Sequence, residues 1–308
     1  MFNQPDDFWG KASPHGAGSP GIPVAEWHPL LSHCADVESA FRALLSLTSY
    51  RSRAEHLLRA ELSPAHIARL ALFAFLHDIG KANAAFQFKI MPRGMRAPWH
   101  RDLACGHLRE ATCLLFHPDL WKITRREIPL TAMSGWFADS DDIIRMLWAS
   151  WSHHGVPLAV AANGAGNVDE RAWKYWEGGR WAKPSNALEM FGQAIRTWFD
   201  DAFTDAAPLV MSPEFQGFYC GLLSLADWVG SNADIDWFPF GMPGDPPRTP
   251  WARDRAVKIV QSMGLDGIKA RAAAARRPDF PTLFGLPHGS LPNDMQRSIM
   301  GLTGDPTQ

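Results

Sequence analysis

Apolar residues recur at helical spacing in three long segments of the chain. In residues 29–46 they follow one another at steps of three and four, which places them on one face of a helix. Residues 63–78 and 212–229 each begin with serine followed by proline, a frequent start of a helix. The first of these two continues as an almost wholly apolar run, so we expect that helix to be buried on most sides.

Two further helices have weaker signals. Residues 140–153 begin with Ser140, the expected N-cap, and with two aspartates in the positively polarised first turn. Residues 102–116 hold apolar side chains in helical phase. Alternating runs of β-branched residues, which would indicate strands, are not found. The pattern therefore predicts a mainly α protein.

Proline and glycine mark the expected domain boundaries. The first 26 residues are rich in proline, glycine and polar residues and are expected to be irregular. After Trp237 the sequence changes to FPFGMPGDPPRTPW, a composition typical of linkers, and a basic stretch follows. We therefore predict a folded domain over residues 1–240 and a Pro/Gly-rich linker with a basic segment over residues 241–308.

Composition excludes several classes of protein. With 46% hydrophobic and 20% charged residues the chain can form a sizeable core, and its net charge of −2 excludes a bulk polycation. The four cysteines form no C-x-x-C pair, which argues against a zinc ribbon or a disulfide framework. The N-terminus lacks a secretory pattern, and the longest apolar run, residues 70–76, is too short to span a bilayer. We expect a cytoplasmic protein without a membrane segment.

Ionisable side chains interrupt the most apolar helices at a few positions. His77 and Asp78 end the stretch LALFAFLHDIGK, and Asp227 is the only charged residue between Glu214 and Asp234. A buried carboxylate is costly unless a cation or several donors satisfy it. Two carboxylates that each end an apolar helix therefore suggest a shared metal ion.

Four more histidines complete a ligand set: His33, His107, His153 and His154. A single histidine on an apolar helix is more often structural, so the interpretation depends on the whole set. Five imidazoles and two carboxylates suit two divalent first-row transition metals, whereas Mg²⁺ and Ca²⁺ prefer oxygen ligands. Two such ions would clamp a phosphate and activate a bound water as nucleophile. The residues thus point to phosphoester hydrolysis.

The order of these residues is similar to that of a known superfamily. HDIGK at residues 77–81, with the flanking histidines and Asp227, resembles the HD phosphohydrolases. Through FWGK, WHPLLSHCADV, SHHG and LLSLADWVGSN, roughly residues 8–237 resemble the HD nuclease domain of the CRISPR-associated nuclease-helicase of type I systems. The final LPNDMQRSIMGL resembles the lead-in to that family's helicase part. No G-x-x-x-x-G-K-[ST] occurs, so we expect no ATP hydrolysis by this chain.

The resemblance implies an HD-domain helical bundle around a dinuclear metal centre, formed by residues 1–240. One metal would be bound by His33, His77, Asp78 and Asp227, and the second by His107, His153 and His154, with Asp78 bridging the two. His33 is preferred to its neighbour His28 because it begins the family's H-x-x-D-V pattern. The ions expected are Mn, Ni, Co or Fe rather than Mg.

Asp78 and Lys81 are the expected catalytic residues. Lys81 resembles the lysine of the family's HD-x-G-K and would neutralise a substrate phosphate; the alternative is a solvated cation just past a helix end. Residues 79–101 hold five Lys/Arg and no acid, interleaved with aromatic residues, which favours binding of single-stranded nucleic acid. The predicted DNA-binding residues are Lys89, Arg93, Arg96, Trp99 and Arg101. The alternative is a solvated loop whose aromatic residues belong to the core.

The leading hypothesis is a metal-dependent endonuclease or exonuclease that hydrolyses single-stranded DNA in CRISPR type I interference by a two-metal mechanism. The resemblance implies two protein partners: a helicase domain, fused or separate, and the RNA-guided surveillance complex that marks the target. Two alternatives stay open. One is an HD phosphohydrolase acting on nucleotides or another small phosphoester, and the other is a non-enzymatic docking module whose metal serves stability.

Overall fold

The computed structural model is mainly helical, which confirms the fold class that the sequence predicts. It describes residues 8–12, 27–90, 105–155, 158, 170–177, 183–241, 248–265, 280–281, 287–294 and 296. The chain divides into two compact units, residues 1–263 and 264–308. All elements named below lie in the first unit. Among the described helices, none has the length and apolar character that crossing a bilayer requires.

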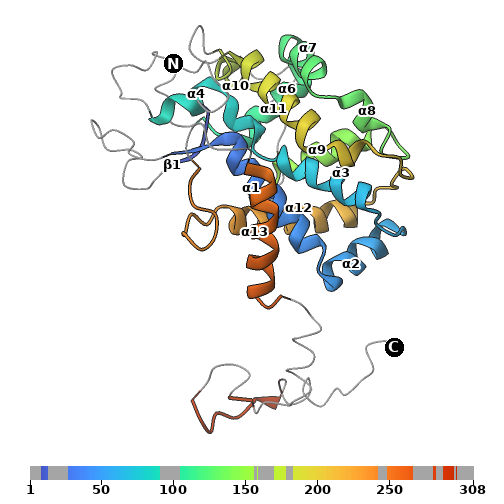
Figure 1. Ribbon diagram of the computed structural model, residues 1–308, viewed down its shortest axis with the longest axis vertical. Coiled ribbons are helices and arrows are strands. Elements are labelled where there is room, and N and C mark those ends of the chain that lie inside the picture. The colour runs from blue at the N-terminus through green and yellow to red at the C-terminus, as the bar shows by residue number, and fades with distance from the viewer. Residues whose placement is uncertain are drawn as a thin grey trace. The chain divides into compact units, whose positions relative to one another are not determined.

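Helix α1 lies at the centre of the first unit, where α3, α12 and α13 pack against it (Figure 1). Helix α9 packs against both α3 and α12. The helices are α1 (Leu30–Leu45), α2 (Thr48–Leu58), α3 (Pro64–Phe75), α4 (Ala84–Gln87), α5 (Leu108–Ala111), α6 (Cys113–Phe116), α7 (Pro118–Glu127), α8 (Leu130–Ser134), α9 (Asp142–Trp151), α10 (Glu170–Lys174), α11 (Pro184–Trp198), α12 (Pro213–Gly230) and α13 (Arg248–Ser262). Short 3₁₀ turns η2 (Ile79–Ala82), η3 (Phe88–Ile90) and η6 (Asp200–Phe203) join some of them.

The three strongest helix predictions correspond to α1, α3 and α12. Ser63 and Ser212 cap α3 and α12 as expected: their hydroxyls accept the N–H groups of His66 and Phe215 at 3.3 and 3.1 Å. Nearly every side chain of α3 is buried, as its apolar sequence predicts. Local capping chemistry and apolar periodicity were therefore sufficient to locate these helices.

The weaker predictions are only partly right. Helix α9 falls within residues 140–153, but Ser140 is not its N-cap; the carboxylate of Asp139 instead accepts the N–H of Asp141 at 3.0 Å. Within 102–116 the structure has two short helices, α5 and α6, in place of one, and residues 102–104 lie outside the described part. Sequence periodicity does not distinguish one continuous helix from two short ones.

Two short strands, which the sequence did not predict, lie near the N-terminus. β1 (Trp9–Ala12) and β2 (Trp27–Pro29) pair antiparallel, with Lys11 opposite His28. Gln87 holds β1 from outside the sheet: its Oε1 accepts the Trp9 N–H at 2.9 Å, and its Nε2 donates to the Trp9 carbonyl at 3.0 Å. The strand thus depends on a distant side chain and not on its own propensity.

Helix α13 is bound to α1 by buried ion pairs. Arg248 Nε lies 2.8 Å from Asp36 Oδ1, and Arg253 Nη2 lies 3.1 Å from Glu38 Oε1, with both carboxylates fully buried. His28 Nε2 also contacts Asp36, at 2.9 Å. The first compact unit therefore includes a helix that follows residue 240, and His28 belongs to this ion-pair network.

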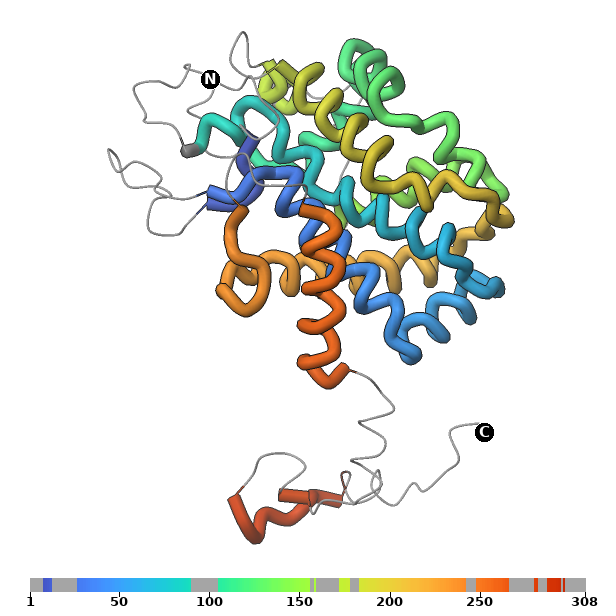
Figure 2. The backbone as a smooth tube through the Cα atoms, viewed as in Figure 1, coloured from blue at the N-terminus to red at the C-terminus, as the bar shows by residue number. Residues whose placement is uncertain are grey.

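Helices α1 and α12, far apart in the sequence, lie side by side (Figure 2). Gly230 permits this, because a Cβ there would lie only 2.7 Å from the backbone nitrogen of Val37. The close approach brings Asp227 of α12 to His33 of α1, with 3.7 Å between Oδ1 and Nε2. Packing of these two helices thus positions two of the predicted ligands.

Candidate metal centre

Seven side chains gather where several helices begin or end. They are His33 in the first turn of α1, His77 and Asp78 after α3, His107 before α5, His153 and His154 after α9, and Asp227 in the last turn of α12. They form three overlapping groups, and within each group the ligand atoms lie within 4.8 Å of one another. These are the seven residues that the sequence predicts as ligands, and their binding of metal stays a prediction.

Asp78 lies between two groups of histidines. Its Oδ2 is 2.9 Å from His33 Nε2 and 3.2 Å from His77 Nε2. Its Oδ1 is 3.1 Å from His107 Nε2 and 3.8 Å from His153 Nε2. Each oxygen of one carboxylate therefore faces a different group of imidazoles.

His77 and His153 are held in the same way. Each follows the end of a helix, and each Nδ1 lies 2.8 Å from the carbonyl oxygen three residues earlier, that of Ala74 or Ser150. Because a carbonyl only accepts, Nδ1 must carry the proton and donate. This leaves Nε2 unprotonated in the neutral ring and directed at the cluster, the arrangement typical of metal-binding histidines.

Besides His33 Nδ1, three buried atoms of the cluster lack a hydrogen-bond partner among the described residues: His77 Nε2, Asp78 Oδ1 and His153 Nε2. A buried polar atom without a partner is costly, and these three atoms belong to one of the groups within 4.8 Å. Imidazole nitrogens and carboxylate oxygens are donors that divalent transition metals accept. The residues of the centre therefore fit a divalent metal ion.

Burial and neighbouring charge shift the pKa values of the cluster. Burial, helped by the charge of Lys81, lowers the pKa of His33 to about 3, and burial with His77 lowers the pKa of His153 to about 3. Burial also lowers the pKa of His77, but the nearby carboxylates, first that of Asp78, outweigh it and raise the pKa to about 9. Burial opposes ionisation of Asp78, yet Lys81 and the histidines hold its pKa well below the usual range. Neutral imidazoles at His33 and His153 are suited to metal binding.

Lys81 is not a solvated cation in this structure. Its ammonium group forms an ion pair with Asp78 Oδ2 and donates to the Gly10 carbonyl at 3.1 Å, and its side chain is only 13% exposed. Lys81 therefore balances the charge of Asp78 and connects the centre to β1. Its catalytic role stays a prediction.

Lys11, which the sequence interpretation did not include, lies beside the centre. Its ammonium group donates to the carbonyl of Ser231, whose hydroxyl donates to Asp227 Oδ1 at 3.0 Å. Burial lowers the pKa of Lys11, and the charge of Asp227 opposes this shift. In the sequence, Lys11 was noted only as part of the FWGK stretch, which supported the family resemblance but suggested no chemical role for the lysine.

Two glycines allow backbone segments to approach the centre closely. A Cβ on Gly80 would lie 1.8 Å from the His107 carbonyl oxygen and 3.0 Å from Ala111 Cβ. A Cβ on Gly10 would lie 3.0 Å from His33 Cβ. The position of His107 relative to Asp78 thus depends on a residue without a side chain at position 80.

The centre is open on one side. His33, His77, Asp78 and His153 are buried, whereas His154 is exposed and the side chains of His107 and Asp227 are 17% and 16% exposed. His154 Nε2 and His107 Nε2 lie 3.3 Å apart. A ligand can therefore approach past His154, His107 and Asp227.

Of the predicted DNA-binding residues, Lys89 lies in the described part of the chain, while Arg93, Arg96, Trp99 and Arg101 lie outside it. Lys89 Nζ donates to the Cys105 carbonyl at 2.7 Å and lies 4.6 Å from the ring centroid of Phe86. Phe86 and Phe88 are buried, which agrees with the alternative interpretation that the aromatic residues of this segment belong to the core. These two rings therefore cannot stack on bases.

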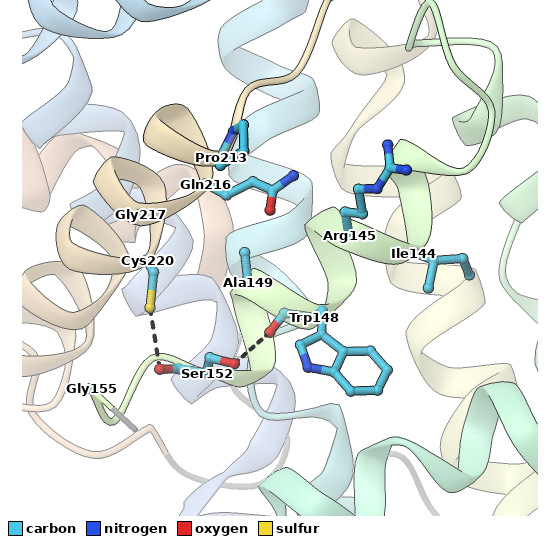
Figure 3. Close-up of a pocket in the computed structure, with 10 residues that line it drawn as sticks. All are labelled: Ile144, Arg145, Trp148, Ala149, Ser152, Gly155, Pro213, Gln216, Gly217 and Cys220. Atoms are coloured by element: carbon cyan, nitrogen blue, oxygen red, sulfur yellow. Dashed lines mark hydrogen bonds between the residues drawn. The ribbon is translucent and has the colours of Figure 1, made fainter. Parts of the chain in front are cut away.

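An open groove of about 610 Å³ lies between α9 and α12 (Figure 3). Trp148 and Ala149 line one wall and Gly217 and Cys220 the other, and Cys220 Sγ donates to the Ser152 carbonyl at 3.2 Å (Figure 3). Ser152 directly precedes His153, so the groove adjoins the centre. Its lining residues include no histidine and no carboxylate, and the chemistry belongs to the centre instead.

One known protein family matches most of this chain. The profile of the family described as "Cas3, HD domain" matches residues 9–236. A search of curated protein sequences finds no significant match.

Several solved structures have a similar fold. T. fusca Cas3-ADP has 15% identity and a TM-score of 0.53, with 84% of this chain and 26% of that chain covered. A CRISPR RNA-guided surveillance complex, pre-nicking, has 18% identity and a TM-score of 0.52 over 96% of this chain and 30% of that chain. The Thermus thermophilus cas3 HD domain in the presence of Ni²⁺ has 21% identity and a TM-score of 0.43, with 80% of this chain and 86% of that chain covered.

The chain spans less than a third of the first two of these structures, and at such identities their likeness shows the fold alone. The family profile, by contrast, covers more than half of the chain. The chain belongs to the Cas3 HD-domain family.

Proposed function

We propose that this chain is a nuclease that hydrolyses phosphodiester bonds of single-stranded DNA with two divalent transition-metal ions. Family membership supports a hydrolase that binds divalent metals. The observation that carries the finer proposal is the position of Asp78, whose two oxygens face separate groups of histidines. One carboxylate placed in this way can bridge two ions.

The proposed ligands divide between the two oxygens of Asp78. His33, His77 and Asp227 would hold one ion with Oδ2, and His107, His153 and His154 would hold the other with Oδ1. When bound, such ions supply Lewis acidity and lower the pKa of a coordinated water. The chain's own residues keep the donors in place: backbone carbonyls orient His77 and His153, and Lys81 balances the charge of Asp78.

The open side of the centre favours a polymer over a small phosphoester. A nucleotide hydrolase would be expected to enclose its substrate, whereas His154 is exposed at the edge of this centre. A docking module whose metal serves only stability would need one closed site, whereas this centre gathers seven potential ligands and is open at His154. Both observations support the nuclease over its two alternatives.

We propose that the chain acts in CRISPR type I interference with a helicase domain and an RNA-guided surveillance complex. The sequence holds no G-x-x-x-x-G-K-[ST] motif, so strand separation would depend on the helicase partner. The nuclease would then cut the displaced single strand.

The test is hydrolysis of circular single-stranded DNA by the whole chain, compared with duplex DNA and a panel of nucleotides, with Mn, Ni, Co, Mg or EDTA present. We expect metal-dependent cutting of the single-stranded circle, which requires an endonuclease. Turnover of nucleotides with intact DNA would favour the small-substrate phosphohydrolase. Bound metal without any hydrolysis would favour the docking module.

Metal binding should raise the melting temperature of the protein. A ligand at 100 times its dissociation constant stabilises by about 2.7 kcal/mol, which for a domain of this size corresponds to about 5–10 °C. EDTA-treated protein should therefore melt lower than protein with saturating Mn or Ni, as measured by differential scanning calorimetry. The His33→Ala variant, which lacks one proposed ligand, is the control and should show a smaller shift. Equal melting temperatures with and without every metal would contradict the metal centre.

Removing two predicted cations should weaken binding of single-stranded DNA. Lys89→Ala combined with Arg93→Ala should lower affinity and reduce the slope of log K against log salt by about 0.7 for each lost phosphate contact. Fluorescence anisotropy at several salt concentrations measures both quantities. Lys122→Ala with Arg126→Ala, two exposed cations on α7, is the matched control. An unchanged affinity in the first variant would show that this segment does not contact DNA.

A further inference from the structure

The most exposed aromatic side chain in the described part of the chain is Trp228, which is 77% exposed on α12. The other exposed tryptophan, Trp251 on α13, is 41% exposed and has Arg248 4.6 Å and Arg255 5.5 Å from its ring centroid. Trp228 has no ring or cation stacked on it among the described residues. Since an indole is a large, flat and mainly apolar surface, Trp228 offers a free stacking face.

Trp228 is adjacent in sequence to Asp227, one of the proposed ligands of the candidate metal centre. It directly follows Asp227, so the two Cα atoms are about 3.8 Å apart. Successive side chains of a helix point about 100° apart, which lets Asp227 face His33 and His77 while Trp228 faces solvent. A group stacked on this indole would therefore be a close neighbour of a group held at the centre.

Lys11 adds a cation at the same helix end. Its ammonium group donates to the carbonyl of Ser231, which lies one turn after Asp227. Pairing of β1 with β2 fixes the backbone of Lys11 opposite His28. No ion pair neutralises this ammonium group within the described residues. An aromatic face and a cation that forms no direct ion pair within the described residues thus lie beside Asp227.

We infer that Trp228 and Lys11 position the single strand that is cut: the indole stacks on a base, and the ammonium group contacts a phosphate next to the one held at the centre. This inference rests on the proposed nuclease function. A cation for the backbone and an aromatic face for a base are the two components of sequence-tolerant binding to single strands. Neither residue is among the seven proposed ligands, so we assign both to the position of the substrate.

This arrangement also selects the substrate. A base within a duplex has both faces covered by its neighbours, and only an unstacked base can lie on Trp228. The side chain would therefore favour single-stranded over duplex DNA when the substrate binds. Because stacking needs no hydrogen bond to the base edges, we expect little sequence preference.

The test measures kcat and KM for a fluorescent single-stranded oligonucleotide with the full chain and saturating Mn. Trp228→Ala should raise KM by about 5- to 150-fold, the range measured for loss of one base–aromatic contact, with bound metal unchanged. Trp228→Phe, which keeps an aromatic face, should restore most of the affinity. Trp251→Ala removes an exposed indole whose face is already covered and serves as the matched control, with KM within twofold of wild type.

Lys11 gives an independent measurement. Lys11→Gln should reduce the slope of log K against log salt for single-stranded DNA by about 0.7, while Lys11→Arg should retain it. Melting temperatures of all variants establish that each one folds.

Three results would overturn the inference. In one, wild type cuts DNA but Trp228→Ala has an unchanged KM. The nuclease function would then hold, but Trp228 would not bind the substrate. In another, Trp228→Phe is as impaired as Trp228→Ala, so that the role is not stacking. In the third, Trp228→Ala cuts normally but no longer associates with a helicase partner, and the surface is a protein-docking site. If wild type fails to cut any DNA, the proposed function itself fails, a distinct outcome.

Discussion

Replacing Asp78 by alanine is expected to abolish cleavage of single-stranded DNA, by about 10³-fold or more, and to remove bound metal. Both oxygens of this carboxylate face histidines, at 2.9 Å from His33 and 3.1 Å from His107. Its loss would therefore affect both proposed ions at once, whereas loss of any single histidine would affect one. Cleavage of a single-stranded circle with Mn measures the activity, and mass spectrometry of the dialysed protein measures the metal.

The matched control is Asp119→Ala. Asp119 is an exposed carboxylate whose partner, Lys122, is also exposed. Surface ion pairs of this kind contribute about 0–1 kcal/mol to stability, so activity and metal content should both equal those of wild type. Wild-type cleavage by Asp78→Ala would contradict the two-metal proposal. Circular dichroism of the variant distinguishes loss of the centre from loss of the fold.

The second large effect is expected from a change that removes no functional group. Gly80→Ala would place a Cβ 1.8 Å from the His107 carbonyl oxygen, so η2 and the segment that carries His107 must move apart. Overpacking of this kind costs about 1–3 kcal/mol. Because a displacement of about 1 Å can lower a rate about 10²-fold, we expect cleavage to fall at least that far, together with the melting temperature.

Gly221→Ala is the control for this substitution. Gly221 lies on the exposed face of α12, and no atom lies within 4 Å of the position its Cβ would take. Alanine favours a helix over glycine by about 0.8–1.0 kcal/mol, so this variant should be as stable as wild type or more stable, with full activity. If Gly80→Ala behaves in the same way, the close approach at position 80 does not position His107.

Much of the fold could be predicted because its signals are local. Ser63 and Ser212 cap their helices as expected, and the apolar face of residues 29–46 becomes the buried face of α1. The gathering of the seven polar residues was also foreseeable, since ionisable side chains at the ends of apolar helices must meet partners. Sequence spacing could not show that the two oxygens of Asp78 face different groups, because that depends on how helices far apart in the chain are packed.

The features that sequence did not predict are those that distant contacts create. β1 depends on hydrogen bonds between Trp9 and Gln87, which are 78 positions apart. Lys11 reaches the carbonyl of Ser231 across 220 positions, so its place beside Asp227 leaves no local pattern. The ends of the short helices α5 and α6 within residues 102–116 could not be predicted for the same reason, since tertiary packing decides where such helices stop.

The ion pairs between α1 and α13 have a practical consequence for work with fragments. A protein truncated at residue 240, the end of the domain expected from sequence, would lose Arg248 and Arg253. The buried carboxylate of Asp36 would then lose its guanidinium partner, and that of Glu38 would keep only Arg42 among the described residues. Breaking one such buried pair costs about 3–5 kcal/mol, a large share of the about 5–15 kcal/mol by which a domain is stable. A fragment intended for crystallisation or NMR should therefore extend to at least Met263.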